Sequence, residues 1–345
     1  MPNIKPERWV TALQRVSEIE RKSSILKRRF RRQKFTFSRR SAWATPAGLA
    51  VLPADQQPEL PGLGHVHKRI SAESILIGKF GVETEVRLRA FYPENNLSVR
   101  YQTGGDRNGV IRTVKAHNLV HPHAPNLMPA VFEHGTIRDN TGAYLIEATL
   151  QGEPATRQQL QELIPPLAAQ LHHVHQGVGI KSKSLVNVVG TGYQWRWKKF
   201  VRAIELEPRT DKAVQELIAR NEQLEVSLTH GDLVGSNILV SDNDFVLVDW
   251  EFAGFKPVAF DMAKLIINVS DVESTLEQIQ RSFNGSVGAE HSHYSLREQI
   301  ALAIVLTLSW YSNHAAKAAI ARRMNALNRQ TTKRVNALKQ LLRVR

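Results

Sequence analysis

The chain has 345 residues, 42% of them hydrophobic and 23% charged, so it can bury a large core in two domains or lobes, and bulk disorder is disfavoured. It contains no cysteine, which excludes a disulfide framework, a thiol nucleophile and a Cys-ligated metal centre. The net charge of +14 lies at the ends: residues 1–40 carry 13 Lys/Arg and 3 Asp/Glu, and residues 316–345 carry 9 Lys/Arg and no acid. The body between them is mildly acidic.

The first predicted element is a basic amphipathic helix over residues 6–30, in which Trp9, Leu13, Val16 and Ile19 recur at helical spacing. Such a helix can lie on an anionic membrane, bind RNA or an acidic partner, or pack its apolar stripe on the protein's own body. Among external partners we favour the membrane over RNA, because the stripe includes a tryptophan. The alternatives stay open at this point.

No stretch is apolar for the roughly 18 residues that a membrane-spanning helix needs. The longest, at residues 300–310, reads as a buried helix, and the N-terminus lacks the apolar segment of a secretory signal. We therefore expect a cytoplasmic protein, with peripheral contact at the inner face of the membrane through its basic termini as the alternative.

The middle of the chain predicts a sheet followed by helices. A Pro-rich linker at 46–64 precedes strands over 72–101, separated by Gly and "PENN" turn signals. A helix around 108–120 and two more strands follow, and beyond "QGEP" the pattern is helical, with Pro165 and Pro166 expected to kink or divide the first helix. The sequence predicts a basic extension and Pro-rich linker at 1–70, a sheet-rich lobe at 71–150, and a helical lobe with a basic C-terminal helix at 151–345.

One segment, "LTHGDLVGSNILVSDNDFVLVDWEFAG" at 228–254, concentrates polar residues between apolar strands. Phosphoryl transfer needs an acceptor hydroxyl that is positioned and relieved of its proton, and metal ions held on the nucleotide phosphates. A base at Asp232, an amide at Asn237 and a carboxylate at Asp249 supply these groups, and hard oxygen ligands suit Mg²⁺. A β-hairpin with surface carboxylates is the alternative interpretation.

The stretches "HGDLVGSNIL" and "VLVDWEFAGFKPVAFDMAKL" resemble the aminoglycoside phosphotransferase and choline kinase family, over roughly residues 72–315. The resemblance implies an α+β, bilobal protein-kinase-like fold, with a small antiparallel-sheet N-lobe, a larger helical C-lobe and, outside it, the basic helical N-terminal extension. It also implies roles for six residues. Asp232 would be the catalytic base, with His230 bracing its loop, and Asn237 and Asp249 would be Mg²⁺ ligands. Asp261 would be structural, and Glu251 would lie behind the metal's direct ligands or contact the substrate.

The same resemblance implies an ATP site in the N-lobe. The backbone near Glu147 to Thr149 would hydrogen-bond adenine, and a loop with Gly78 and Gly81 would cover the phosphates. The cation on the third strand falls on Arg100 rather than a Lys, and the following helix contains no Glu to hold it. Arg and Lys are not interchangeable at such a position.

These observations predict an ATP- and Mg²⁺-dependent phosphotransferase that acts on a hydroxyl of a small molecule, sugar or lipid-linked glycan. The short spacing from Asp249 to Asp261 disfavours a protein substrate. The alternative is a pseudokinase-like nucleotide-binding scaffold attached to membrane or RNA through its basic termini, which Arg100 and the missing helix Glu support. A metal site at His117, His121 and His123 is also conceivable, with a polar loop as its alternative.

Overall fold

The computed structural model describes residues 6–26, 49–50, 72, 74–78, 86–104, 108–137, 142–241, 244–283, 293–320 and 323–344. The chain divides into two compact units. Unit 1 comprises residues 1–118 and 128–152, and unit 2 comprises residues 119–127 and 153–345. Gly81 and most of the Pro-rich segment lie outside the described residues.

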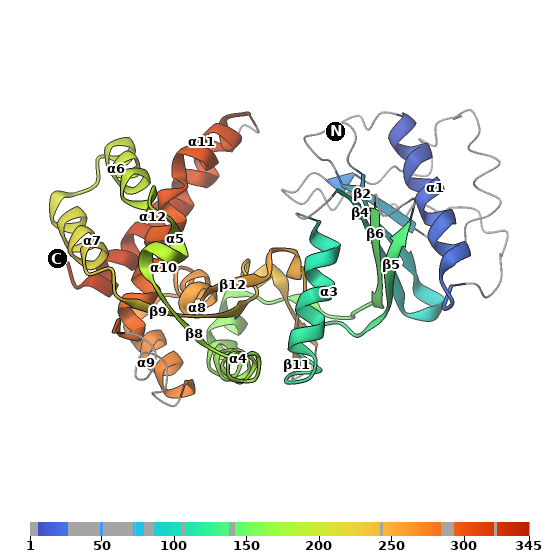
Figure 1. The fold of residues 1–345 in the computed structure, drawn as a ribbon, viewed down its shortest axis with the longest axis horizontal. Coiled ribbons are helices and arrows are strands. Elements are labelled where there is room, and N and C mark those ends of the chain that lie inside the picture. The colour runs from blue at the N-terminus through green and yellow to red at the C-terminus, as the bar shows by residue number, and fades with distance from the viewer. Residues whose placement is uncertain are drawn as a thin grey trace. The chain divides into compact units, whose positions relative to one another are not determined.

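Unit 1 is built on an antiparallel six-stranded sheet of order β1-β2-β3-β4-β6-β5. Its elements are α1 (Pro6–Lys22), β1 (Leu49–Ala50), β2 (Ser74–Gly78), β3 (Arg87–Tyr92), η2 (Pro93–Asn95), β4 (Leu97–Thr103), α3 (Gly109–Val120), β5 (Val131–Ile137) and β6 (Gly142–Ala148). The strands and the helix at 109–120 match the pattern expected from the sequence. Figure 1 shows α1 on one face of this sheet and α3 on the other.

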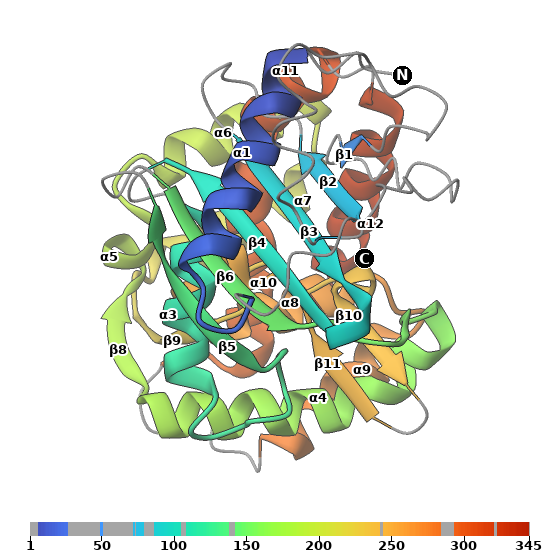
Figure 2. The same cartoon turned by 90° about the vertical axis from the view of Figure 1, so that its right-hand side faces the viewer.

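Alternation along the strands assigns the two faces of the sheet different chemistry. Leu88 pairs with Tyr101 and Ala90 with Val99, and all four are buried in the core that α1 covers (Figure 2). The other face carries Arg89, which lies directly opposite Arg100 in the ladder, and Leu145, which packs in the cluster that includes residues of α3. The apolar face is therefore the core of unit 1, and the face toward α3 holds the arginines.

The described part of the apolar stripe of α1 packs on the protein's own sheet, which is one of the alternatives that the sequence left open. Ala12, Val16 and Ile19 are fully buried in the core of unit 1. Two carboxylates secure the helix: Glu20 accepts hydrogen bonds from the Tyr92 hydroxyl (2.8 Å) and the Ala72 amide (3.0 Å), and Glu133 holds the turn that follows the helix. Val16 and Ile19 are therefore used internally and do not argue for a membrane, while the side chains of Trp9 and Leu13, the other members of the predicted stripe, lie outside the described residues.

Unit 2 contains helices and two three-stranded sheets, of orders β11-β10-β7 and β12-β9-β8. Its strands are β7 (Glu153–Pro154), β8 (Lys181–Ser184), β9 (Gln223–Thr229), β10 (Ile238–Ser241), β11 (Asp244–Leu247) and β12 (Gly254–Pro257). Its helices are α4 (Arg157–Val178), α5 (Leu185–Val189), α6 (Tyr193–Ile204), α7 (Pro208–Ala219), η3 (Gly235–Asn237), η4 (Trp250–Phe252), α8 (Ala259–Ile266), α9 (Val272–Ser282), α10 (Leu296–Ser309), α11 (Tyr311–Ile320) and α12 (Met324–Leu342).

The sequence predicted that Pro165 and Pro166 would kink or divide the first helix of this unit. They do not divide it, because α4 runs through both prolines. Each proline removes one backbone donor. The helix is maintained by a capping box at Thr156 and by an apolar face, including Ile164 and Leu171, that is buried along its length. Burial of that face outweighs the two missing hydrogen bonds.

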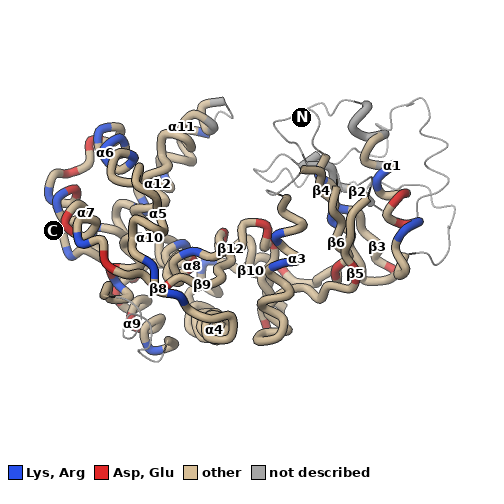
Figure 3. Tube along the Cα trace, in the orientation of Figure 1, with Lys and Arg blue, Asp and Glu red and all other residues tan. Residues whose placement is uncertain are grey.

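The basic C-terminus is a packed helix rather than a free tail. Leu327, Leu338 and Leu341 of α12 are buried, and Lys339 pairs with Glu207 at 2.5 Å. Figure 3 shows further lysines and arginines on α6 and α8 of the same unit. Among the described residues, no helix is long and apolar enough to cross a membrane.

Candidate active site

The loop after β9 is fixed from within by His230, which is fully buried. Its Nε2 lies 2.8 Å from the Val248 carbonyl, and its Nδ1 accepts a hydrogen bond from the Asp232 amide at 3.3 Å. This pair of contacts requires the neutral ring protonated at Nε2. Burial holds the pKa of His230 below its usual value, against the opposing charge of Asp261 and, more weakly, of Asp232 and Asp249. The histidine therefore braces the loop, and all three carboxylates lie near it.

Asp261, from the first turn of α8, holds the backbone of the same loop. The carboxylate is fully buried and accepts hydrogen bonds from the amides of His230 (2.7 Å) and Gly231 (2.9 Å). Gly231 has a φ of 82°, and a Cβ there would lie 2.2 Å from the Phe252 carbonyl oxygen. Only glycine fits that position without moving the loop.

The structure brings Asn237 and Asp249 to the same place through one residue, Val248. Asn237 donates from Nδ2 to the Asp232 carbonyl (2.8 Å), and its own carbonyl accepts the Val248 amide (3.0 Å). Asp249 follows immediately, half-buried, with a φ of 61° at the start of η4, which also carries Glu251. The hydrogen bond at Nδ2 orients the Asn237 amide, whose Oδ1 also accepts a long hydrogen bond from the Ser236 hydroxyl at 3.5 Å.

Lys264 is the contact that sequence reasoning missed. Its Nζ lies 2.5 Å from Oδ1 of Asp232, with the lysine side chain 18% exposed and the aspartate 38% exposed. No hydrogen bond to Oδ2 comes from the residues that the structure describes. A signal was present, because Lys264 lies three residues after Asp261 on a helix, and that spacing puts both side chains on one face.

In unit 1, Arg100 and Glu147 face one another. Arg100 Nη1 lies 3.8 Å from Glu147 Oε2, both side chains are buried, and Arg89 contacts the other carboxylate oxygen. The sheet itself thus supplies the anion that the following helix lacks. The amides of Ala148 and Thr149 donate to the carbonyls of residues 130 and 96, so both amides are engaged within the protein. Gly78 ends β2 opposite Arg87.

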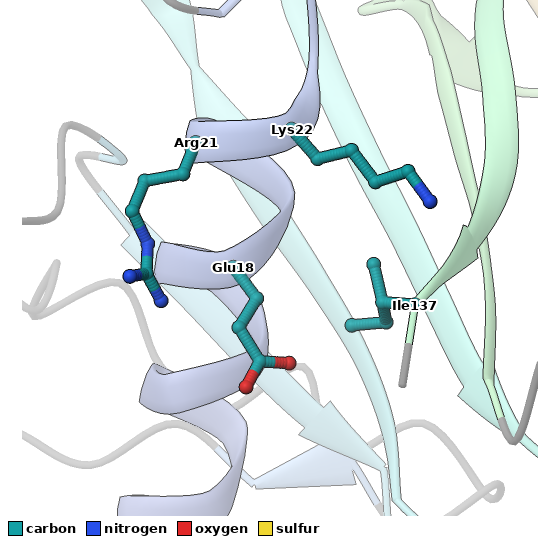
Figure 4. Close-up of a pocket in the computed structure, with 4 residues that line it drawn as sticks. All are labelled: Glu18, Arg21, Lys22 and Ile137. Carbon is teal, nitrogen blue, oxygen red and sulfur yellow. The ribbon is translucent and has the colours of Figure 1, made fainter. Parts of the chain in front are cut away.

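The histidine alternative finds no support in the described residues, where no group of three His, Cys, Asp or Glu side chains could hold a metal ion. Gly177 leaves room for the His123 ring, whose Nδ1 would lie 2.2 Å from a Cβ there. A shallow depression of about 360 Å³ in unit 1 is lined by Glu18, Arg21, Lys22 and Ile137 (Figure 4), and contains none of the predicted site residues.

A model of the phosphotransferase enzyme family matches residues 108–294, more than half of the chain and the part that holds the loop, its brace and Asp249. The chain belongs to the phosphotransferase enzyme family. The enzyme class expected from the motif is therefore confirmed. No curated protein matches this chain in sequence.

Solved structures similar to this phosphotransferase include the GDP and kanamycin complex of APH(2")-IIia, with 13% identity and a TM-score of 0.50, covering 79% of this chain and 94% of that one. A choline/ethanolamine kinase family protein from Mesorhizobium loti has 14% identity, a TM-score of 0.43 and coverages of 76% and 92%. The macrolide 2'-phosphotransferase MphH from Brachybacterium faecium has 17% identity, a TM-score of 0.45 and coverages of 74% and 91%. The first of these bears out the protein-kinase-like fold, with its antiparallel sheet and helical part.

Proposed function

We propose that this phosphotransferase transfers the γ-phosphoryl group of ATP to a hydroxyl of a small molecule, with Asp232 as the base. The observation that carries the proposal is the network joining the two halves of the motif. His230 and Asn237 bond the carbonyl and the amide of Val248, so the loop that bears Asp232 is tied to the residue preceding Asp249. This connection supports Asp232 as the base that accepts the proton and Asp249 as a carboxylate that suits a metal.

In the proposed reaction the acceptor oxygen forms a bond to the γ-phosphorus while the bond from that phosphorus to the ADP oxygen breaks. The hydroxyl proton passes to Asp232, whose Oδ1 is held by Lys264. Asp261 and Gly231 keep this carboxylate in place, since their contacts leave the loop backbone one conformation. His230 braces the loop and takes no proton, because it is buried and both ring nitrogens are engaged.

Asn237, which precedes β10, and Asp249, which follows β11, suit a magnesium ion. An amide oxygen at Asn237 and a carboxylate at Asp249 are hard ligands, and Mg²⁺ in such sites takes one or two protein carboxylates and completes its shell with water and phosphate oxygens. When bound, the ion would neutralise charge on the transferring phosphate. Glu251, in the next turn, would act on the ion's water shell or on the acceptor.

For unit 1 we propose the nucleotide contacts: Gly78 and Gly81 over the phosphates, the backbone at Glu147 to Thr149 for adenine, and Arg100 as a phosphate contact. Similar folds solved with GDP and kanamycin, or with AMP-PNP and hygromycin B, support a nucleotide and a small hydroxyl acceptor. The choice of ATP over another nucleotide belongs to the proposal.

The test is Asp232→Asn against Asp244→Asn, a matched change at an exposed carboxylate of the neighbouring hairpin. ATP consumption by the purified full chain should fall by at least about 1,000-fold in the first variant and remain unchanged in the second. Binding of a fluorescent ATP analogue should persist in both. Unchanged turnover in Asp232→Asn would remove the assignment of the base.

A second candidate is nucleotide binding without efficient transfer. The observation that favours it is the pairing of Arg100 with Glu147, which engages the cation expected to grip phosphate. Measuring ATP consumption with and without Mg²⁺, beside an Asp249→Asn variant, separates the two candidates. Turnover that requires both Mg²⁺ and Asp249 supports the kinase, and nucleotide binding with no such turnover supports the second candidate.

A further inference from the structure

Two basic side chains of unit 2 lie against the loop that bears Asp232, and the charge of a third interacts with Asp232 itself. They come from separate elements: Lys256 from β12, Lys264 from α8 and Arg334 from α12. In the proposed transfer to a neutral hydroxyl, Lys264 holds Oδ1 of Asp232, but Lys256 and Arg334 have no task, because the metal ligands and the loop brace are supplied by other residues. Their shared position therefore needs its own explanation.

Lys264 has the closest contact with the base. Its ammonium lies 2.5 Å from Oδ1 of Asp232, and 5.6 Å from the centroid of the Phe260 ring. One ammonium can donate to more than one acceptor, since it has three protons. While it donates to Oδ1 of Asp232, Lys264 can still donate a second hydrogen bond to the acceptor molecule. That bond would go to a group next to the hydroxyl that hydrogen-bonds to Oδ2 of Asp232.

Lys256 lies near the same ring. Its ammonium is 4.9 Å from the Phe260 centroid and donates to the Phe252 carbonyl at 2.8 Å. A Cβ on Gly231 would lie 2.3 Å from this nitrogen, which places the ammonium directly against the backbone of the residue preceding Asp232. Two ammonium groups thus lie within 6 Å of one aromatic ring beside the proposed base.

Arg334 adds a third positive charge. It is half-buried on α12, where burial lowers the pKa of its guanidinium and the charge of Asp232 opposes that effect. It lies outside the stretch matched by the family, residues 108–294, so this part of the site is supplied by the basic C-terminal helix of this chain. A cation near the base disfavours a cationic acceptor, since like charges in a half-buried site repel.

We propose that the acceptor of this phosphotransferase is anionic, a hydroxyl compound whose carboxylate or phosphate is bound by Lys256 and Lys264 beside Asp232. The inference rests on the proposed function, because it assigns the acceptor to the base that function names. Charge-assisted hydrogen bonds from two ammonium groups would orient the molecule and place its hydroxyl at Oδ2. Arg334 would contribute long-range attraction rather than a contact.

The experiment compares four acceptors on one sugar scaffold: glucose, glucosamine, glucuronate and glucose 6-phosphate. Binding of each to the nucleotide-free full chain is measured by calorimetry at fixed ionic strength, and phosphoryl transfer is measured separately with ATP and Mg²⁺. The variants are Lys264→Gln, Lys256→Gln and, as control, Lys212→Gln, whose side chain is 80% exposed on α7. Thermal melts establish that each variant is folded.

The expected result is tighter binding of glucuronate or glucose 6-phosphate than of glucose by at least about 10-fold, lost in both site variants and retained in Lys212→Gln. A carboxylate-selective and a phosphate-selective outcome both support the proposal, and they distinguish the source of the charge. Equal binding of glucose, preference for glucosamine, or an anion preference that survives both site variants overturns it.

Two further outcomes separate this inference from the proposed function. If the lysine variants lose affinity for an ATP analogue and keep their affinity for glucuronate, the lysines serve the nucleotide and the inference fails alone. If anion binding depends on both lysines but no ATP is consumed with any acceptor, the proposed kinase activity fails while the anion site stands. The binding arm thus decides the inference without relying on turnover.

Discussion

The loop of unit 2 and the charged face of unit 1 contain similar residues but use them differently. In the loop each carboxylate has its own partner, the amides of residues 230 and 231 for Asp261 and Lys264 for Asp232. On the face of unit 1, Glu147 is shared by Arg89 and Arg100, two cations that also oppose each other in the ladder. We infer that the separate partners in unit 2 position individual carboxylates for a reaction, whereas the carboxylate shared by two arginines in unit 1 stabilises the sheet.

This comparison makes the backbone of the loop the most sensitive point of the molecule. Gly231→Ala should abolish transfer and lower the free energy of unfolding of unit 2 by about 3 kcal/mol, because a left-handed φ and an overlap with the Phe252 carbonyl both oppose a Cβ. The matched control is Gly254→Ala, where a Cβ would meet nothing within 4 Å.

Urea unfolding followed by tryptophan fluorescence, together with ATP consumption, measures both effects of Gly231→Ala. Trp250 suits this readout, since it is buried beside His230 with 4.7 Å between the ring centroids. A Gly231→Ala variant as active and stable as Gly254→Ala would show that the loop accommodates a side chain and is not held as the contacts indicate.

The contrast also explains how far the sequence could lead. Spacing alone predicted that His230, Asp232, Asn237 and Asp249 come together, because a loop and a hairpin fix such neighbours over short distances. The spacing of Asp261 and Lys264 indicates that both lie on one face of a helix, but the contact between Lys264 and Asp232 also depends on how α8 packs against the loop. The sequence could not show that Glu147 would serve as the partner of Arg100, since that pairing arises from cross-strand register.

The same limit applies at both termini. The sequence predicted basic helices at both ends, but charge counting gave no position for them, whereas the buried apolar residues of α1 and α12 determine where these helices lie. Val16 and Leu338 are fully buried in their units. The positions of the adjacent basic residues, Arg15 and Lys339, follow from the packing of these helices. Net charge describes an average over a segment, whereas packing is decided by the few residues on one face.

On the side of unit 1, replacing the shared carboxylate tests whether these charges are structural. Glu147→Gln should lower the free energy of unfolding by about 2 kcal/mol, because two guanidinium groups lose their counter-charge in a buried position. Glu94→Gln, at an exposed position of the same unit, is the control. Calorimetric melting measures the difference.

A change in ATP affinity without a change in melting temperature in Glu147→Gln would contradict the structural interpretation. It would mean that Arg100 is held for the nucleotide and that its pairing with Glu147 adds little to stability. If Glu147→Gln lost stability with only a modest change in ATP affinity, the phosphate contacts of unit 1 would have to come from residues other than Arg100.

The smallest expected effect concerns the attachment of α1 through Glu133. Burial alone would raise the pKa of this carboxyl. Hydrogen bonds from the hydroxyls of Ser24, Tyr144 and Ser23 and from the Ile25 amide outweigh that effect and lower the pKa. A carboxyl with a lowered folded pKa stabilises the fold above its ordinary pKa, and this contribution is lost as the pH falls through the folded value.

Glu133→Gln should therefore weaken the docking of α1 by about 1 kcal/mol at neutral pH, a modest value because the site is partly open to solvent. The difference from the natural protein should shrink as the pH falls through the lowered pKa of Glu133, below which both proteins carry a neutral group. Amide hydrogen exchange of residues 11–26 measures the docking directly. A difference that is constant from pH 7 to 3 would assign the effect to lost packing, since only the ionised carboxylate gives this dependence on pH.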